Sequence, residues 1–323
     1  MTYVERLVRL FDNPLIVKDG VSRMRSWRAP LVLTLYLGVL GLFGYSVFVA
    51  LIVISSSDRS GAAQIGGIVF ETMAFMQLSL VALFAPALAA GAISGERERQ
   101  TFDVLLVSRL SALSIVWGKL VASVAFMLLL ILAALPLFAA VFLFGGIDFE
   151  QFVITQLLTV TTAISIAAVS LFLSATFGRT LSSTVAAYGA AFAGMVGTLI
   201  VGGLLSVGLL GRAAGQTVSV SANVHPLEFA NPFYSMWIVL NSPNGAPMPL
   251  GRLMQMLAFM PGSPSSLGPM IEPWVTTILV QAVLVALSIT GAVQLVQHRR
   301  AYVPTRPLEP IPLVERVDAG SEA

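Results

Sequence analysis

The sequence predicts an all-α, polytopic membrane protein with six transmembrane helices. The chain is 57% hydrophobic and only 11% charged, whereas a soluble domain is usually about 25% charged. Six apolar runs each exceed the roughly 20 residues that a helix needs to cross the hydrocarbon of a bilayer. Cysteine is absent, which excludes disulfides, thiolate metal sites and cysteine nucleophiles.

The apolar runs define the expected spans and the segments around them. The spans are expected at residues 30–54, 68–93, 115–144, 152–177, 182–210 and 273–297. We expect one transmembrane domain over residues 29–300, a segment 1–28 before it and a tail 301–323 after it. Ser111 or Ser114 is expected to cap the third helix. The proline-rich, mixed-charge tail is typical of disorder.

The segment 1–28 combines a helical stripe with a run of basic residues. Val4, Leu7, Val8 and Phe11 recur at the spacing of one helix face. This pattern predicts a short amphipathic helix that lies along the membrane interface. The alternative is that the basic residues act only as an orientation signal, which would not require the stripe.

The basic residues predict the orientation of the spans. Of the 18 lysine and arginine residues, 15 fall on one side of the predicted spans, and only Arg59, Arg212 and Arg252 fall on the other. Cytoplasmic segments of membrane proteins are enriched in these residues. We therefore expect both termini, and the segment between the second and third helices, to be cytoplasmic.

The loop 211–272 is then expected on the external side. It contains two apolar segments, residues 229–240 and 250–260, that are too short to span a membrane. Two interpretations are open at this point. The segments are either interfacial or re-entrant helices at the outer mouth, or ordinary packed loop structure.

Residues 94–119 carry the most informative pattern, a dense charged segment between the second and third spans. Placing the six charges between residues 96 and 109 at the centre of a membrane would cost on the order of 15–20 kcal/mol. The segment is therefore expected in water, where it is available to a soluble partner. These six charged residues are Glu96, Arg97, Glu98, Arg99, Asp103 and Arg109.

An apolar stripe runs through the same segment. Phe102, Leu106, Leu110 and Leu113 follow one another at spacings of 4, 4 and 3, with Leu105 beside them. This spacing predicts a short amphipathic helix after the second span. Its apolar face would lie on the membrane or in a groove of a partner. A plain solvated loop is the alternative, and it explains the charges but not the stripe.

Three spans carry residues that suggest a translocation path or helix packing. Glu71 is the only acid within a predicted span, with Gln77 deeper, and it is either functional or reaches water by snorkelling. Small residues recur at every fourth position around Gly194, which predicts close packing, within the chain or against a second protomer. Packing within the chain is the interpretation we favour. The hydroxyl-rich fourth span either lines a polar path or, more commonly, bonds to its own backbone.

Signatures of catalysis are absent from the sequence. There are only two histidines, and neither H-E-x-x-H nor G-x-S-x-G occurs. Gly118-Lys119 lacks an upstream glycine-rich loop, so it is not a phosphate-binding loop. We expect no catalytic, cofactor-binding or metal-binding residues in this chain, no nucleic-acid partner and no ATP hydrolysis of its own.

Two blocks of sequence match a family pattern. The first contains Asn13-Pro14 with Lys18, Arg23 and Arg25. The second, residues 85–119, contains Ala85-Pro86, Ile93-Ser94-Gly95-Glu96-Arg97-Glu98, Thr101, Asp103, Leu105-Leu106 and Gly118-Lys119. The pattern resembles that of the permease subunits of ABC-2 type transporters. The chain departs from it at Lys18-Asp19, where one bacterial branch commonly has Lys-Glu.

The resemblance implies that the segment after helix two is a coupling helix, which inserts into a groove of a separate cytoplasmic ABC ATPase subunit. It implies that this ATPase binds ATP and Mg²⁺, and that two permease protomers, identical or different, form the path. Such a protein would lie in the lipids of the bacterial inner membrane, and export is favoured on family grounds. The implied contact residues are Glu96, Arg97, Glu98, Arg99, Thr101, Phe102, Asp103, Leu105 and Leu106, with the aromatic and leucine side chains as the apolar anchor.

Two other classes of function remain as alternatives. A self-sufficient secondary transporter or channel predicts several buried charges, broken helices or internal repeats, and the sequence offers one marginal charge, at Glu71. An intramembrane enzyme would need a nucleophile, a metal set or an acid pair, none of which is identifiable. Neither the substrate class nor the choice between homodimer and heterodimer follows from the sequence.

Overall fold

The computed structural model describes residues 27–55, 61–102, 111–206, 230–241 and 273–301. Several predicted features lie outside these residues. They are the interfacial helix of segment 1–28, the contact residues Asp103, Leu105 and Leu106, the second short apolar segment at 250–260 and the tail.

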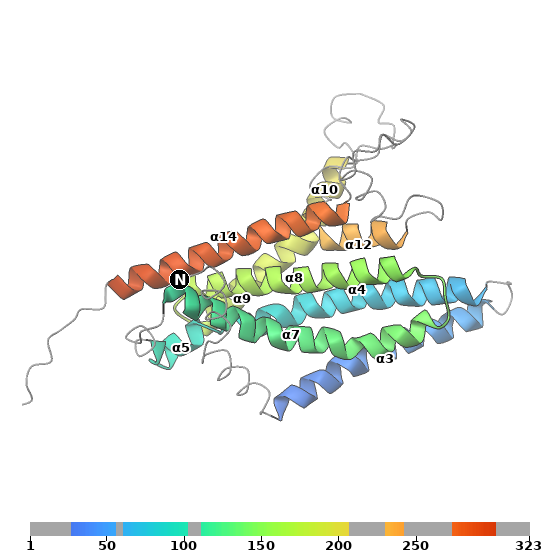
Figure 1. The fold of residues 1–323 in the computed structure, drawn as a ribbon, viewed down its shortest axis with the longest axis horizontal. Coiled ribbons are helices and arrows are strands. Elements are labelled where there is room, and N and C mark those ends of the chain that lie inside the picture. The colour runs from blue at the N-terminus through green and yellow to red at the C-terminus, as the bar shows by residue number, and fades with distance from the viewer. Residues whose placement is uncertain (1–26, 56–60, 103–110, 207–229, 242–272, 302–323) are drawn as a thin grey trace, which may run out of the picture.

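Long helices packed side by side make up the described part of the chain (Figure 1). Six of them are long and apolar enough to cross a membrane, and the described residues contain no strand. The chain is therefore an all-helical, multi-pass membrane protein. Five crossings are single helices: α3 (Arg28–Ser55), α4 (Ala62–Ala89), α7 (Ala112–Phe142), α8 (Phe149–Thr176) and α14 (Pro273–Ala301).

The fifth crossing differs from the prediction of one continuous α-helix. It consists of α9 (Thr180–Phe192), a five-residue π-helix η1 (Ala193–Gly197) and α10 (Thr198–Ser206). A π-helix widens one turn by an extra residue. The small residues at every fourth position therefore do not stay on one face along the whole crossing.

Two short helices flank the bundle at opposite ends. One is α5 (Ser94–Glu98), between α4 and α7. The other is α12 (Pro232–Leu240), which falls within the predicted apolar segment 229–240. It packs against α4, α8 and α14 and buries Met236 and Val239, so this part of the segment is a packed helix and not packed loop structure.

Local sequence explains where several of these helices begin. Ser111 precedes α7, and its hydroxyl accepts a hydrogen bond of 3.1 Å from the backbone N–H of Ser114, which confirms the predicted cap. Asp148 begins α8 in a capping box with Gln151, and Asn231 caps α12, whose first residue is Pro232. Each cap satisfies N–H groups that a helix start leaves unpaired.

Helix α8 lies at the centre of the bundle. It packs against α4, α7, α9, α12 and α14, whereas α3 packs against α4 and α7 on the far side. The interior contains a cluster of aromatic rings: Phe70 lies 5.3 Å from Phe138 and 6.1 Å from Phe152 between ring centroids. These three side chains link α4, α7 and α8 through the bundle.

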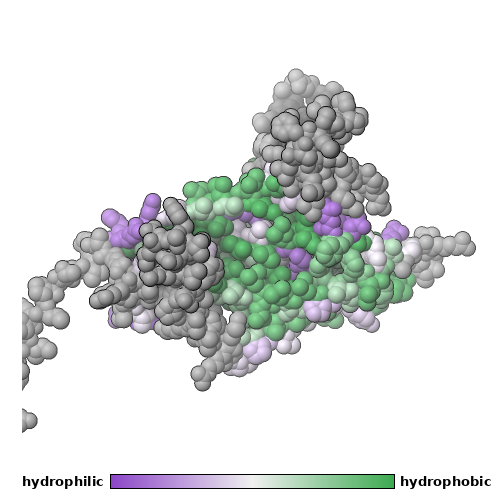
Figure 2. All heavy atoms as spheres, in the orientation of Figure 1, coloured by the Kyte–Doolittle hydropathy of each residue, from purple (hydrophilic) through white to green (hydrophobic). Residues whose placement is uncertain are grey.

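The outer helices expose apolar side chains. Leu42 on α3, Leu181 on α9 and Leu287 on α14 are all more than 60% exposed. Figure 2 shows apolar side chains over most of the middle of the bundle on the face drawn there. A helix that is apolar on its outer face as well as its inner face is typical of a membrane span.

The turn between α7 and α8 explains why α4 begins at Ala62, six residues before the predicted start. Gly145 and Gly146 have φ values of +79° and +88°, and the carbonyl oxygen of Gly145 lies only 2.4 Å from where a Cβ on Gly66 would be. Only residues without a side chain allow this approach. Residues 66–67, which lie outside the predicted span, are therefore part of the packed first turns of α4.

Replacement of Gly146 by alanine should destabilise the fold. A Cβ there would lie on the carbonyl oxygen of Ala63, and the positive φ adds strain. We expect a loss of about 2 kcal/mol or more, visible as a lower thermal midpoint in detergent. Gly38→Ala is the matched control, because its Cβ meets no atom within 4 Å. Equal midpoints for the two variants would contradict the proposed close packing.

Candidate functional site

The candidate site is a polar junction formed by α5 and the helix ends around it. Helix α5 ends in a turn that reverses the chain. Gln100 has a φ of +56°, its N–H bonds to the carbonyl of Arg97 at 3.0 Å, and the N–H of Thr101 bonds to that of Glu96 at 2.9 Å. This is the Schellman pattern of hydrogen bonds, here with glutamine at the position that usually holds glycine. The turn points Phe102 back into the protein.

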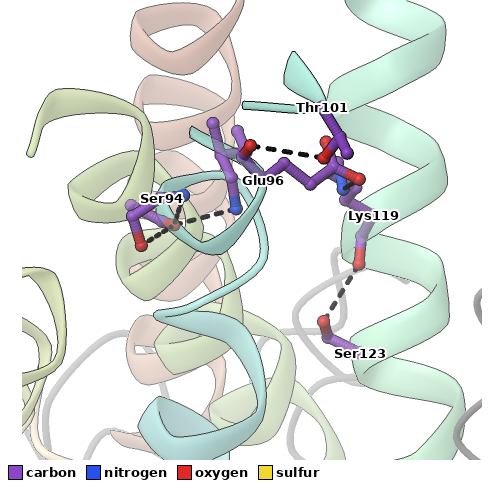
Figure 3. Close-up of polar contacts among 7 residues, drawn as sticks. Ser94, Glu96, Thr101, Lys119 and Ser123 are labelled. Carbon is purple, nitrogen blue, oxygen red and sulfur yellow. Dashed lines mark hydrogen bonds and ion pairs between the residues drawn. The ribbon is translucent and has the colours of Figure 1, made fainter. Parts of the chain in front are cut away.

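Glu96 joins α5 to α7 through an ion pair. Its Oε1 lies 2.7 Å from Nζ of Lys119, whose side chain is only 3% exposed while that of Glu96 is 26% exposed. Figure 3 shows the two side chains directed toward each other, with Thr101 bonded back to the Glu96 backbone. Because Lys119 is buried, removing its partner would leave an uncompensated charge in the protein interior.

Arg97 joins α5 to the end of α8. Its two terminal nitrogens donate hydrogen bonds to the carbonyl oxygens of Ala175 at 2.6 Å and Phe177 at 3.0 Å. The last carbonyls of a helix have no partner within the helix, and they form the negative end of its dipole. The guanidinium also lies 5.1 Å from the centre of the Phe102 ring, a cation–π distance.

Glu98 joins α5 to the start of α9. Its Oε1 accepts a hydrogen bond of 2.8 Å from the backbone N–H of Thr180, and its Oε2 accepts one of 2.8 Å from the Thr180 hydroxyl. A carboxylate at a helix N-terminus satisfies an unpaired N–H and meets the positive end of the dipole. Three charged residues in the same short helix thus hold three different membrane-spanning helices.

Buried serines reinforce the junction. The hydroxyl oxygen of Ser174 on α8 accepts hydrogen bonds of 3.0 Å from the N–H groups of both Ile93 and Ser94. The hydroxyl of Ser183 on α9 donates to the carbonyl of Ala90, and its oxygen lies 3.3 Å from that of Ser94. The tight turn between α4 and α5 would otherwise leave these backbone groups unpaired in the interior.

The polar contacts of the junction attach α5 to three neighbouring helices. Glu96, Arg97 and Glu98 bond to α7, to the end of α8 and to the start of α9. Among the described residues, no group of three or more histidine, aspartate or glutamate side chains is placed to hold a metal ion.

Five of the expected contact residues fall into two groups. Glu96, Arg97 and Glu98 bind within the chain, as described above. Arg99 and Thr101 are exposed at the tip of the turn, as is Gln100 between them, which was not an expected contact. We name these three residues the α5 tip.

Phe102 corrects an expectation. We expected its ring to be an apolar anchor for a partner, but it is only 4% exposed. It packs in the chain's own core with Ala89, Val116 and Leu120. The reason is the reversal at Gln100, which directs the ring inward, where it also lies against Arg97.

The candidate path residues do not come together. Glu71 is partly exposed at the α12 end, where Oε1 accepts a hydrogen bond of 2.9 Å from Asn241. Gln77 is fully buried, and its carboxamide exchanges two hydrogen bonds of 3.3 Å with that of Gln156. Gly194 lies on the fifth crossing, far along the chain from both.

Gly194 does not lie in a packed helix–helix contact of the described chain. It is exposed, and a Cβ built there would meet no atom within 4 Å. The favoured interpretation, packing within the chain, is therefore wrong at this residue. Gly194 instead lies beside an open space between the fifth crossing, α8 and α14.

The hydroxyls of α8 behave partly as expected. Thr159, Thr161 and Thr176 each donate a hydrogen bond to a carbonyl three or four residues back. Ser174 and Thr162 instead accept hydrogen bonds from other parts of the chain, the latter from Gln281 on α14. These two contacts link helices rather than satisfying α8 alone.

Sequence reasoning missed several residues of these networks. Ser174 and Ser183 were indistinguishable from other membrane serines, because their partners are far along the chain. Gln281 offered a signal, since a carboxamide in an otherwise apolar span usually has a partner. Asn231 also offered a signal in the sequence, because Asn followed by Pro is a pattern typical of a helix start.

Comparisons with known proteins do not assign the chain. No protein-family model matches it, and no curated protein matches it.

Replacement of Lys119 by methionine should destabilise the protein strongly. The change leaves the Glu96 carboxylate facing an apolar group in a largely buried site, a loss of about 3 kcal/mol. Thermal unfolding in detergent measures it. The double variant Glu96→Gln/Lys119→Met should recover most of that loss, because both charges are then absent. Additive losses in the double-mutant cycle would show that the two side chains are not coupled.

Proposed function

We propose that this chain is the membrane-spanning permease subunit of an ABC-2 type, ATP-driven transporter, and that it acts as an exporter. In this proposal it works as a dimer, with an identical or a different protomer, in the inner membrane of a bacterium. A separate cytoplasmic ATPase binds ATP and Mg²⁺ and supplies the energy. Both termini and the α5 end of the bundle face the cytoplasm.

The observation that carries the proposal is the position of α5. It is a short charged helix between the second and third spans, and its sequence resembles the family pattern. Its inner side is fixed to α7, α8 and α9 by Glu96, Arg97 and Glu98, while the α5 tip is exposed. A partner that pushes on the tip would therefore act on three spans at once.

The charge distribution supports the same orientation. Arg97, Lys119, Arg179 and Arg299 all lie in or beside the α5 end of the bundle. A membrane protein usually keeps such an excess of basic residues on the cytoplasmic side. This orientation brings the α5 tip to the compartment that contains ATP.

The mechanism follows from how the tip is held. Closure of two ATPase subunits moves the α5 tip, and the Schellman turn passes the displacement to Glu96 and Arg97. Lys119 on α7 and the carbonyl groups at the end of α8 should move with them, because breaking a buried ion pair costs about 3–5 kcal/mol. The helices therefore move as a connected set.

Purification from native membranes tests the proposal most directly. We expect an ATPase with a phosphate-binding loop to co-purify with the tagged chain at about equal stoichiometry, as mass spectrometry would show. ATP hydrolysis should belong to that subunit and be absent from the isolated chain. A chain that purifies without any ATPase, yet transports in vesicles without ATP, would favour a secondary transporter or channel.

Charge reversal at the α5 tip should weaken the association with the ATPase. Arg99 is exposed, so Arg99→Glu should leave the thermal midpoint of the chain unchanged while reducing ATPase capture about fivefold or more. Arg299→Glu is the matched control, because it reverses another exposed charge at the same end of the bundle. Phe102→Asp would be a poor test, since it would disrupt the core. Equal capture by both arginine variants would remove the α5 tip from the interface.

A further inference from the structure

A cavity of about 100 Å³ lies between α8, α14, the fifth crossing and α12. Thr162, Ser165 and Ser170 of α8 form one side of it, Gln281 and Leu284 of α14 another, and Gly194 part of a third. This volume is enough for a few water molecules, or for the polar end of one larger molecule. None of the lining residues is charged.

Two polar groups in the wall of the cavity lack partners. Gln281 is 5% exposed; its Nε2 donates a hydrogen bond of 2.8 Å to the Thr162 hydroxyl, but its Oε1 is buried and unpaired. Ser170 is 1% exposed, and its hydroxyl is also buried and unpaired. Buried polar groups are normally hydrogen-bonded. Rotation of either terminal torsion would offer these atoms to a guest in the cavity.

The π-helix borders this space. Asn231, at the start of α12, donates hydrogen bonds to the Met195 carbonyl at 2.5 Å and to the Thr198 hydroxyl at 2.6 Å. It thus ties the irregular turn to α12. Gly194 and Met195 of this turn line the cavity, and Ala190 and Gly194 add almost no side-chain volume.

The surroundings of the cavity indicate how a guest would reach it. Helix α9 exposes Leu181 and Val185, and α14 exposes Val283 and Leu287, so both helices present apolar faces to the membrane. The cavity is itself largely lined by apolar surface, including Ile166 and Leu284. A molecule arriving from the hydrocarbon would meet apolar walls first and unpaired polar groups at the floor.

We propose that this cavity binds the hydrogen-bonding end of an uncharged amphipathic molecule that enters from the membrane, with a long-chain alcohol as the simplest example. The hydroxyl donates a hydrogen bond to Oε1 of Gln281, while the alkyl chain lies along α9 and α14. A charged headgroup is disfavoured, because no lining residue would compensate its charge. The site does not depend on the proposed coupling to an ATPase.

Photolabelling of the full chain in lipid nanodiscs tests the site. The probe is a diazirine-bearing octanol, and the matched control is the corresponding diazirine octane without the hydroxyl. We expect the alcohol to label peptides of α8, α14 and the segment 187–195, and excess unlabelled octanol to compete. The alkane should label these peptides no more than it labels the membrane faces of α3.

Three variants locate the binding groups. Gln281→Leu keeps the side-chain size but removes the acceptor, and Ser170→Ala removes the hydroxyl. Gln281→Leu should reduce specific labelling by about fivefold, the effect of losing one hydrogen bond. Ser170→Ala should have a smaller effect, because Ser170 lies about two turns along α8 from Thr162, the partner of Gln281. Gly194→Leu should narrow the cavity and reduce labelling, because Gly194 is one of its lining residues and a side chain there has free space around it. Gly189→Leu is the matched control: it is equally open but does not line the cavity.

Defined outcomes would overturn the proposal. Equal labelling of the cavity peptides by alcohol and alkane would show an apolar crevice without a polar site. Labelling by the alcohol that survives both Gln281→Leu and Gly194→Leu would place the probe elsewhere. Absence of competable labelling in the wild-type chain would mean that the cavity holds only water. Thermal midpoints measured beside each experiment separate loss of binding from loss of fold.

Discussion

The ion pair between Glu96 and Lys119 constrains everything at the α5 end of the bundle. Lys119 is almost fully buried, and an ammonium group in such a place needs a permanent counter-charge. That requirement fixes where Glu96 must lie, and therefore how α5 leaves α4. Once α5 is placed, Arg97 reaches the carbonyl end of α8 and Glu98 reaches the amide end of α9.

The interior of the bundle follows the rule that a membrane imposes on polar groups. Lipid offers no hydrogen bonds, so polar side chains in the spans pair with one another or with backbone. Gln77 pairs with Gln156, and Ser235 on α12 lies 2.6 Å from Thr277 on α14. These pairs join helices that apolar packing alone would leave free to slide. Gln281 and Ser170 each depart from this rule with one buried, unpaired polar atom, and both residues lie in the wall of the cavity.

The sequence was sufficient for features that depend on local composition. Six spans could be predicted because lipid demands about 20 apolar residues per crossing, and Ser111 could be predicted as a cap because its partner is three residues away.

The environment of Phe102 could not be predicted from the sequence, because an apolar stripe does not reveal whether it faces a partner or the chain's own core. The links from Ser174 to Ile93 and from Glu98 to Thr180 join residues about 80 positions apart, beyond the reach of any periodicity. The π-helix was also hidden, since Ala-Gly-Met-Val-Gly has no distinctive pattern.

The π-helix at 193–197 carries one extra residue relative to an α-helical turn, and this makes the fifth crossing unequally tolerant of different mutations. A point substitution there changes one side chain. Deletion of one residue within 193–197 would let the turn relax to α-helical geometry while α9 and α10 keep nearly the same rotational register, because the wider turn already accommodates the extra residue. A deletion within α9 would instead rotate everything beyond it by about 100° around the helix axis, and Thr198 would turn away from Asn231. Among related sequences, loss of one residue in this crossing should therefore concentrate at 193–197.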